Sequence, residues 1–183
     1  MDNIKAVYLA AEDLKIAASI LYQAYHDDPL FMDIFQFNKE GYESRLRSAI
    51  REELNAFWQA RQPMIGLFDD GRLLAVACLL TAGYFGTKQM VDKEQKVREH
   101  IPAKRYHMLS FIGVHPDYQH YGLGHILMSA IDSVMKEDSG SEGIGVYVTL
   151  PKCLSFFEDG QYKMLEALET GHITGHLMFC DRQ

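Results

Sequence analysis

The chain has little of what would mark a membrane, secreted or zinc-binding protein. No run of about 18 uncharged apolar residues occurs, and the N-terminal segment is too charged, with too short an apolar part, for a secretory signal. The 3 cysteines are widely spaced and include no Cys-x-x-Cys pair, so neither a disulfide framework nor a zinc ribbon is suggested. We therefore expect a cytoplasmic protein with reduced thiols.

Positive charge is also scarce. The chain has 18 Lys and Arg against 25 Asp and Glu, a formal net charge of -7, which argues against a general nucleic-acid surface and mildly favours cationic small partners. No repeat, low-complexity tract or long linker divides the chain, and 48% of its 183 residues are hydrophobic. We expect a single domain over residues 1–183, monomeric or homodimeric, with no nucleic-acid or membrane partner.

The spacing of apolar residues in the first half predicts a strand, two helices and a β-hairpin. The first helix is expected to start near Leu14 and to stop at Asp28-Pro29. Asp69-Asp70-Gly71 predicts the turn of the hairpin, because Asp-Gly accepts the positive φ that such turns need. A mixed-charge segment, residues 83–106, is interpreted as a helix capped by Thr87. The other predicted elements are a strand at 4–9, a helix at 42–61 and hairpin strands at 64–68 and 72–81.

The second half predicts a strand, helix and strand in succession. Strands are expected at 108–114 and 144–150, and the helix between them starts near Gly122 with an apolar stripe at spacings of three and four. A succession of this length is a βαβ crossover, which makes the two strands parallel. A short helix at 151–159 and an antiparallel hairpin, with strands at 162–168 and 173–180, complete a mixed α/β fold.

Two glycines, Gly122 and Gly124, stand at the first turn of that helix. A helix N-terminus presents unpaired N–H groups to anions, and glycine lets a phosphate reach the backbone without meeting a Cβ. The alternative is that the glycines only allow a tight turn and close helix packing. A Rossmann fingerprint would need a third glycine at Leu127, and a P-loop would need a Gly-Lys-Ser/Thr sequence that the chain lacks.

The sequence around these glycines resembles the acetyl-CoA motif of the GNAT superfamily of N-acetyltransferases. In that family Gln/Arg-x-x-Gly-x-Gly/Ala follows a strand ending in Val-x-Pro, and here Gln-His-Tyr-Gly-Leu-Gly at 119–124 follows Val-His-Pro at 114–116. The resemblance is specific over residues 109–134, and the order of elements along the whole chain is similar. It implies a mixed, mostly antiparallel sheet flanked by helices, with a central βαβ acetyl-CoA motif.

The resemblance also implies a role for particular residues. The backbone N–H groups of residues 119–124 would hold the CoA pyrophosphate, and Ile112 and Val114 would pair with the pantetheine amides like an added strand. The oxyanion donor is expected near Val114. The full set implied for acetyl-CoA, the co-substrate, is Ile112, Gly113, Val114, Gln119, His120, Tyr121, Gly122, Leu123, Gly124 and His125.

The sequence indicates the general acid and general base of the reaction less clearly than the acetyl-CoA-binding residues. The strand that begins near Tyr106 contains no carboxylate, so His107 is the nearest candidate base; the alternative is a histidine exposed at the strand entrance. Residues 151–158 read Pro-Lys-Cys-Leu-Ser-Phe-Phe-Glu where the family often has Pro-x-Asn-Leu-x-Phe-Tyr-Glu. The usual tyrosine acid is therefore Phe157, and Tyr162 or Tyr147 is the candidate substitute.

Three further features of the sequence are a group of histidines, a cysteine at a helix start and a set of aromatic residues. The histidines at positions 115, 120 and 125 lack an HExxH or Cys/His ligand spacing, so no metal is expected. Cys153 lies at a helix start, where a covalent acyl-cysteine is conceivable. Aromatic residues could line an acceptor pocket or simply form core; these are Tyr25, Phe31, Phe35, Phe37 and Trp58.

These observations favour an acetyl-CoA-dependent N-acyltransferase that moves acetyl to a primary amine of a small molecule or peptide by direct attack. The alternative, suggested by the missing tyrosine, is a catalytically weak acetyl-CoA- or CoA-binding sensor. The sequence does not identify the acceptor.

Overall fold

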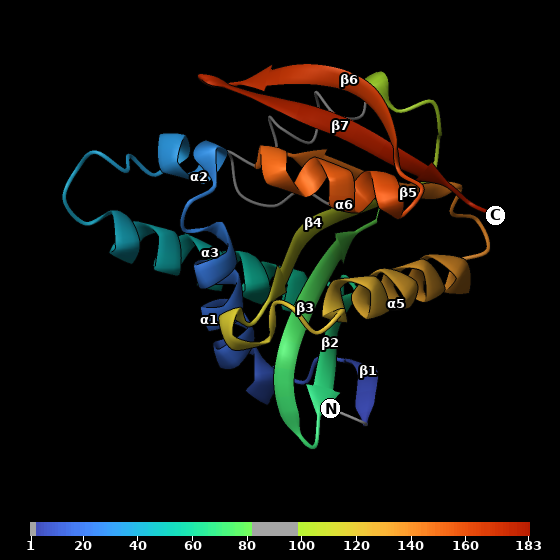
Figure 1. Ribbon diagram of the computed structural model, residues 1–183, viewed down its shortest axis with the longest axis horizontal. Coiled ribbons are helices and arrows are strands. Elements are labelled where there is room, and N and C mark those ends of the chain that lie inside the picture. Colours follow the sequence, from blue (N-terminus) through green and yellow to red (C-terminus); the bar gives the residue numbers. More distant parts are fainter. Residues whose placement is uncertain (1–2, 82–98) are drawn as a thin grey trace.

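A twisted, mostly antiparallel sheet organises the molecule (Figure 1). The computed structural model describes residues 3–81 and 99–183. Within these residues the sheet has 7 strands in the order β1-β2-β3-β4-β5-β7-β6, and β4 and β5 are its parallel pair. The predicted βαβ crossover is thus confirmed. The strands are β1 (Ile4–Tyr8), β2 (Met64–Asp69), β3 (Arg72–Leu80), β4 (His107–Val114), β5 (Gly143–Val148), β6 (Lys163–Thr170) and β7 (Ile173–Asp181).

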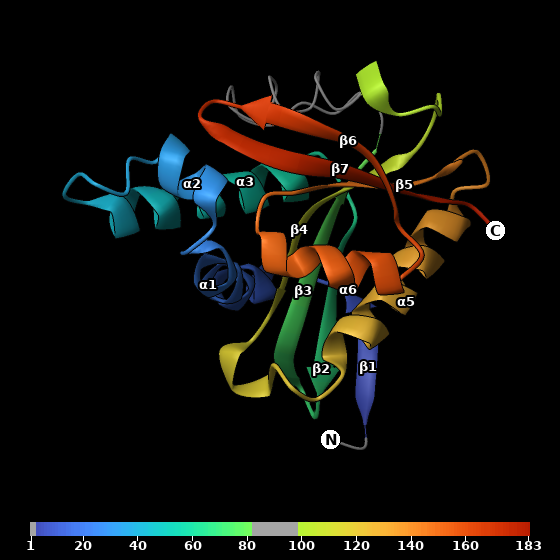
Figure 2. The same cartoon turned by 45° about the horizontal axis from the view of Figure 1, so that its top comes forward.

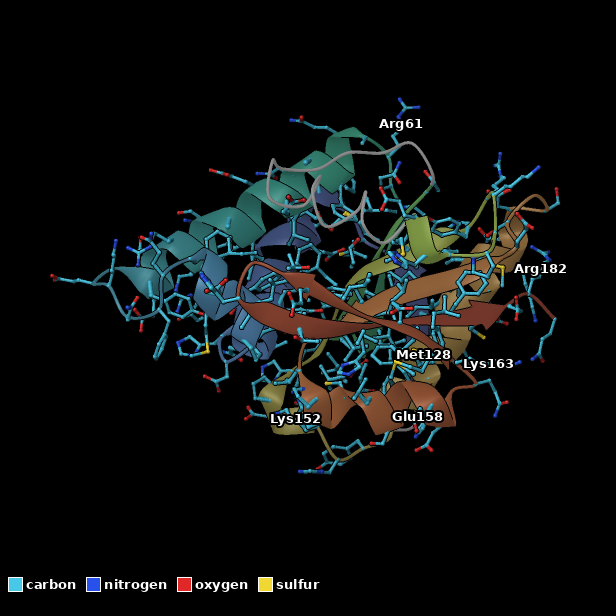
Figure 3. The ribbon with its side chains drawn as sticks, turned by 90° about the horizontal axis from the view of Figure 1, so that it is seen from above. Arg61, Met128, Lys152, Glu158, Lys163 and Arg182 are labelled. Atoms are coloured by element: carbon cyan, nitrogen blue, oxygen red, sulfur yellow. The ribbon has the colours of Figure 1, made fainter. Side chains whose placement is uncertain are left out.

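Helices cover both faces of this sheet (Figure 2). One face carries α1 (Leu14–Tyr25), α2 (Pro29–Ile34) and α3 (Tyr42–Gln59), and the other carries α5 (Leu123–Glu137) and α6 (Leu154–Asp159). The view from above in Figure 3 shows α3 and α6 on opposite sides of the strands. Each face has its own apolar core, as the period of apolar residues in α1, α3 and α5 predicts. Among the described residues, no helix combines the length and the apolarity needed to cross a membrane.

The stop predicted at Asp28-Pro29 is also the start of a new helix. The Asp28 carboxylate accepts hydrogen bonds from the backbone N–H groups of Leu30 (2.9 Å) and Phe31 (3.4 Å), and Pro29 occupies the first helical position. Aspartate before proline is therefore an N-cap here. The prediction of a helix end was right, but it missed the 6-residue α2 that follows.

The hairpin predicted at Asp69-Asp70-Gly71 is confirmed. Asp70 and Gly71 have φ angles of 52° and 81°, the left-handed pair of a type I′ turn. The helix predicted over 83–106 lies mostly outside the described residues.

The two parallel strands soon part. β4 and β5 pair from His107 to Leu109 on one strand and from Ile144 to Val146 on the other. On its other side β4 continues to pair with β3 as far as Val114, with a register shift that leaves Ser110 without a partner. The end of β4 therefore has one edge that faces a gap in the sheet instead of a neighbouring strand.

Candidate functional site

A cleft of about 90 Å³ lies where β4 and β5 separate. Its walls come from both strands, from the junction between α1 and α2, and from the segment that leads into α6. Side chains that matter for chemistry in this lining are Tyr25, Asp28, Thr149, Cys153 and Phe157. Residues that lie far apart in the sequence thus meet around the open edge of β4.

The backbone of β4 presents alternate amides to this cleft. His115 N–H donates to the Leu74 carbonyl on β3 (2.8 Å), whereas Ile112 N–H donates to the Tyr25 hydroxyl (2.9 Å) on the cleft side. Because amide direction alternates along a strand, Val114 N–H faces the cleft and Gly113 N–H faces β3. Of the two amides predicted to pair with pantetheine, Ile112 is therefore already engaged and Val114 is the second donor.

Gly113 has a packing role that the prediction did not assign. A Cβ at this position would lie 3.0 Å from the Cβ of Ala24 and 3.2 Å from Leu21. The missing side chain lets α1 approach β4 closely, and this approach brings Tyr25 to the cleft. Gly113 thus supports the site through α1, because its own amide faces away.

The two glycines at the start of α5 serve different purposes. Gly122 has a φ of 75°, and an added Cβ would meet nothing within 4 Å. At Gly124 an added Cβ would lie 2.8 Å from the Phe156 ring of the neighbouring helix α6. Close helix packing therefore explains Gly124, whereas Gly122 combines a left-handed backbone with open space in front of the helix.

The N-terminus of α5 retains donors for an anion. Within the described chain, the N–H groups of Leu123, Gly124 and His125 make no backbone hydrogen bond, as expected for a first helical turn. The Gln119 amide donates to the Val114 carbonyl (2.8 Å) and so ties the preceding loop to β4. His120 and Tyr121 are exposed beside this turn.

The side chain of Leu123 is buried in the core under α5, and the imidazole of His125 lies against the Phe156 ring, 5.7 Å between centroids. Either residue can therefore offer a ligand its backbone N–H, but the side chain of Leu123 is unavailable to one. The helix dipole adds a positive potential at the same turn.

Asp28 is the functional candidate that the sequence reasoning missed. Its side chain is 3% exposed, and its Oδ1 and Oδ2 lie 2.8 Å and 2.6 Å from the Thr149 hydroxyl just beyond β5. The carboxylate is thus held at the cleft by both of its walls. The Asp28-Pro29 pair marks a helix N-cap in the sequence, and it could have drawn attention to this carboxylate. Asp28 lies outside β4, the strand in which a carboxylate base was expected.

The predicted catalytic side chains His107 and Tyr162 do not line the cleft. His107 is buried where β4 begins, and its Nδ1 lies 2.8 Å from the Ser141 hydroxyl. His107 is therefore not the exposed histidine of the alternative, and it lies where β4 is still paired with β5, away from the open edge. Burial lowers its pKa. Tyr162 packs in the core beneath Phe157, 5.4 Å between ring centroids, and burial raises the pKa of its hydroxyl.

The remaining side chains at the cleft limit which residues can act as proton donor or nucleophile. Phe157, at the position of the missing tyrosine, is among the residues that line the cleft. The Tyr147 hydroxyl donates to the Leu168 carbonyl (2.7 Å), in the β6–β7 hairpin. Burial raises the pKa of the Cys153 thiol, which disfavours a thiolate nucleophile. Burial also raises the pKa of Tyr25 well above its ordinary value, so its hydroxyl stays protonated.

The aromatic residues considered for an acceptor pocket separate into three groups. Tyr25 lines the cleft, Phe35 lines a second cavity between α2 and α3, and Phe31 lines both. Phe37 and Trp58 are 49% and 41% exposed. Over residues 3–81 and 99–183, no group of three or more His, Cys, Asp or Glu side chains is arranged to hold a metal ion.

Comparison with known proteins gives one family and many similar folds. The model of the Acetyltransferase (GNAT) family matches residues 21–158. Comparison with curated protein sequences finds no match.

Among solved structures, a histone acetyltransferase HPA2-related acetyltransferase from Corynebacterium glutamicum is 12% identical, with a TM-score of 0.76 over 98% of this chain and 97% of that one. The C-terminal condensation domain of Ebony, in complex with beta-alanyl-dopamine, is 16% identical, with a TM-score of 0.77 over 99% and 100%. The PaiA N-acetyltransferase of Thermoplasma acidophilum, in complex with coenzyme A, is 17% identical, with a TM-score of 0.63 over 98% and 99%.

The fold and the strand-to-helix motif thus agree with a family match that spans most of the sequence, and the chain belongs to the GNAT family of acetyltransferases.

Proposed function

We propose that this enzyme transfers the acetyl group of acetyl-CoA to a primary amine of a small molecule or peptide, by direct attack of the amine. The observation that carries the proposal is the open edge of β4, which leads from the cleft side chains to the N-terminus of α5. Two solved relatives, PaiA and YncA, were obtained with coenzyme A and with acetyl-CoA respectively. Their low identity supports the fold, and the family match supports the reaction class.

The residues present suit such a co-substrate. Val114 N–H offers a strand-type donor to a pantetheine amide, and Ile112 N–H offers a second once the Tyr25 hydroxyl moves away. The N–H groups of Leu123, Gly124 and His125 can donate to a pyrophosphate bound at the N-terminus of α5, and Gly122 leaves room for it there.

Asp28 is the proposed general base. An attacking amine must lose one proton as its nitrogen forms the new N–C bond, and Asp28 is a carboxylate at the cleft wall. Oδ1 accepts from two backbone N–H groups, whereas Oδ2 has, among the described residues, only the Thr149 hydroxyl as a hydrogen-bond neighbour, so Oδ2 is the oxygen with remaining capacity for the proton. Thr149 holds this carboxylate in place through its hydroxyl.

Tyr25 is the proposed oxyanion donor. In the free enzyme the Tyr25 oxygen accepts from Ile112 N–H, which leaves its own O–H available to the cleft. Once a pantetheine carbonyl has taken Ile112 N–H, the protonated Tyr25 hydroxyl can donate to the thioester oxygen as that atom gains negative charge. The C–S bond then breaks, and the thiolate leaves without help from Phe157; with a thiol pKa of about 8.5, it can take its proton from water.

An amine panel with detection of released thiol tests the proposal. Acetyl-CoA should release CoA in the presence of at least one primary amine, and Asp28→Asn should lower kcat by about 100-fold or more while CoA still raises the melting temperature. A chain that binds CoA but releases no thiol with any amine would instead be the sensor considered above. If CoA gives no thermal shift at millimolar concentration, both functions are wrong.

The lost tyrosine provides a second test. Phe157→Tyr should raise kcat if proton donation to the thiolate limits the rate, because the ring already faces the cleft. An unchanged kcat would show that water already supplies this proton fast enough.

A further inference from the structure

A second cavity, of about 410 Å³, lies between α2 and α3 beside the cleft. Its size falls within the range of small-molecule sites, about 300–1,000 Å³. The apolar part of its wall includes Phe31, Phe35, Ile50 and Phe111. Phe31 lines both the cavity and the cleft, and Phe111 directly precedes Ile112. The cavity is therefore separated from the proposed reacting centre by little more than one side chain.

Arg45, which lines the cavity together with Phe35, holds the connection between α2 and α3 in place. The connection from α2 to α3 loops away from the sheet in Figure 1. The Arg45 guanidinium donates to four carbonyls of this connection, those of Phe35 (2.9 Å), Gln36 (2.9 Å), Lys39 (3.1 Å) and Glu40 (2.7 Å). A cavity fixed in this way orders few residues when it is filled, which favours binding.

The charge of the lining restricts what can enter. Among the lining residues that the structure describes, Glu52 and Glu53 are the carboxylates, with Glu53 buried, and Arg45 is the cation. The N–H groups of Arg45 are already used by backbone carbonyls, so its guanidinium is poorly placed to receive a second anion. The cavity therefore accepts neutral or cationic groups and disfavours a carboxylate or phosphate.

We propose that this cavity holds the apolar body of the acceptor, and that the acceptor is a primary amine with a phenyl-sized or branched alkyl group that carries no carboxylate. The proposal rests on the acetyltransferase function proposed above. The amine nitrogen lies in the cleft near Asp28, and the apolar group passes Phe31 into the space between α2 and α3. Figure 2 shows these two helices together on the side of the sheet that carries α1.

Thiol release from acetyl-CoA with matched amines tests this assignment. The probes are n-propylamine, 3-methylbutylamine, 2-phenylethylamine and 4-(2-aminoethyl)benzoate. We expect kcat/KM for 3-methylbutylamine and 2-phenylethylamine to exceed that for n-propylamine by at least about tenfold, since each buried methylene is worth roughly that factor. The benzoate carries its carboxylate on the end of the ring that enters the cavity, and it should react at least about tenfold more slowly than 2-phenylethylamine.

Variants on α3 connect this preference to the cavity. Ala49→Phe fills the cavity and should bring the ratio of 2-phenylethylamine to n-propylamine close to one. Asn55→Phe adds the same ring to an exposed position of the same helix, outside the cavity, and should leave the ratio unchanged. Glu53→Gln, or Glu52→Gln if the buried change prevents folding, should reduce the discrimination against 4-(2-aminoethyl)benzoate.

The outcomes separate the two proposals. No thiol release from any amine overturns the proposed function. Thiol release with equal kcat/KM for small and large amines, or a preference that survives Ala49→Phe, overturns the cavity assignment and leaves the acetyltransferase function standing. A preference that disappears in Ala49→Phe but not in Asn55→Phe supports both.

Discussion

Replacing Tyr25 by phenylalanine should tighten CoA binding and slow acetyl transfer at the same time. In the wild type, Ile112 N–H donates to the Tyr25 hydroxyl at 2.9 Å, so a pantetheine carbonyl must displace that hydroxyl before it can pair with Ile112. Without the hydroxyl the amide has no side-chain partner until the ligand arrives. A polar group left unsatisfied costs about 1–2 kcal/mol, which predicts a Kd about 5-fold to 30-fold lower.

The same hydroxyl is the proposed oxyanion donor. Removing one such donor costs about 10²–10³ in kcat in other acyl-transfer enzymes, and we expect a loss of about 100-fold here. The Tyr25 ring also packs against Phe31 and Phe111, at 5.1 Å and 5.6 Å between centroids, and phenylalanine keeps these contacts. The fold should therefore survive the change.

Isothermal titration with CoA and thiol-release kinetics measure the two effects separately. Tyr22→Phe, one turn earlier on the same helix and outside the cleft, is the matched control and should change neither value. A Kd that is unchanged or higher in Tyr25→Phe would show that the hydroxyl does not compete for Ile112. An unchanged kcat would refute its role as oxyanion donor.

Three further predictions follow from the α5 turn and from His107. Asparagine and aspartate both tolerate the left-handed backbone at Gly122, so Gly122→Asp should bind CoA at least about tenfold more weakly than Gly122→Asn if a phosphate lies there; equal Kd values in titration would exclude this position. Gly124→Ala should lower the free energy of unfolding in urea by about 1–3 kcal/mol, and the loss should be smaller in a Phe156→Ala background. An equal loss in both backgrounds would show that the added Cβ does not meet the Phe156 ring. Because burial depresses the pKa of His107, the contribution of neutral His107 to stability is present above the unfolded pKa of about 6.5 and is lost as pH falls below it. His107→Gln should therefore flatten the loss of stability on acidification, whereas exposed His120→Gln should not; equal unfolding curves for both variants at pH 5 and pH 7 would contradict this.

The elements of the fold could be predicted because their signals are local. The Asp70-Gly71 pair predicts a turn from two adjacent residues, and the apolar stripe of α5 predicts a helix that packs on a sheet. The crossover between β4 and β5 follows from the order of strand, helix and strand. The family motif likewise lies within one continuous stretch.

The catalytic side chains could not be predicted in the same way, because contacts between distant segments decide them. Asp28 reaches the cleft only because α1 packs on β4 at Gly113 and because Thr149 stands at the opposite wall. His107 lies close in sequence to the open edge, but the pairing with β5 buries it before the strands part. Sequence distance was therefore a poor measure of proximity to the reacting centre.

The two oxygens of Asp28 are chemically unequal, which gives the site a handedness. Oδ1 receives the N–H groups at the start of α2, so protonation there would weaken the helix cap, whereas Oδ2 can gain a proton without breaking either bond. An acceptor amine must then approach from the Oδ2 side, and this limits which of its faces can meet the thioester. Asp28→Glu would keep the negative charge but move the carboxylate by one methylene. From the new position the carboxylate could no longer both cap α2 and accept the proton of the amine.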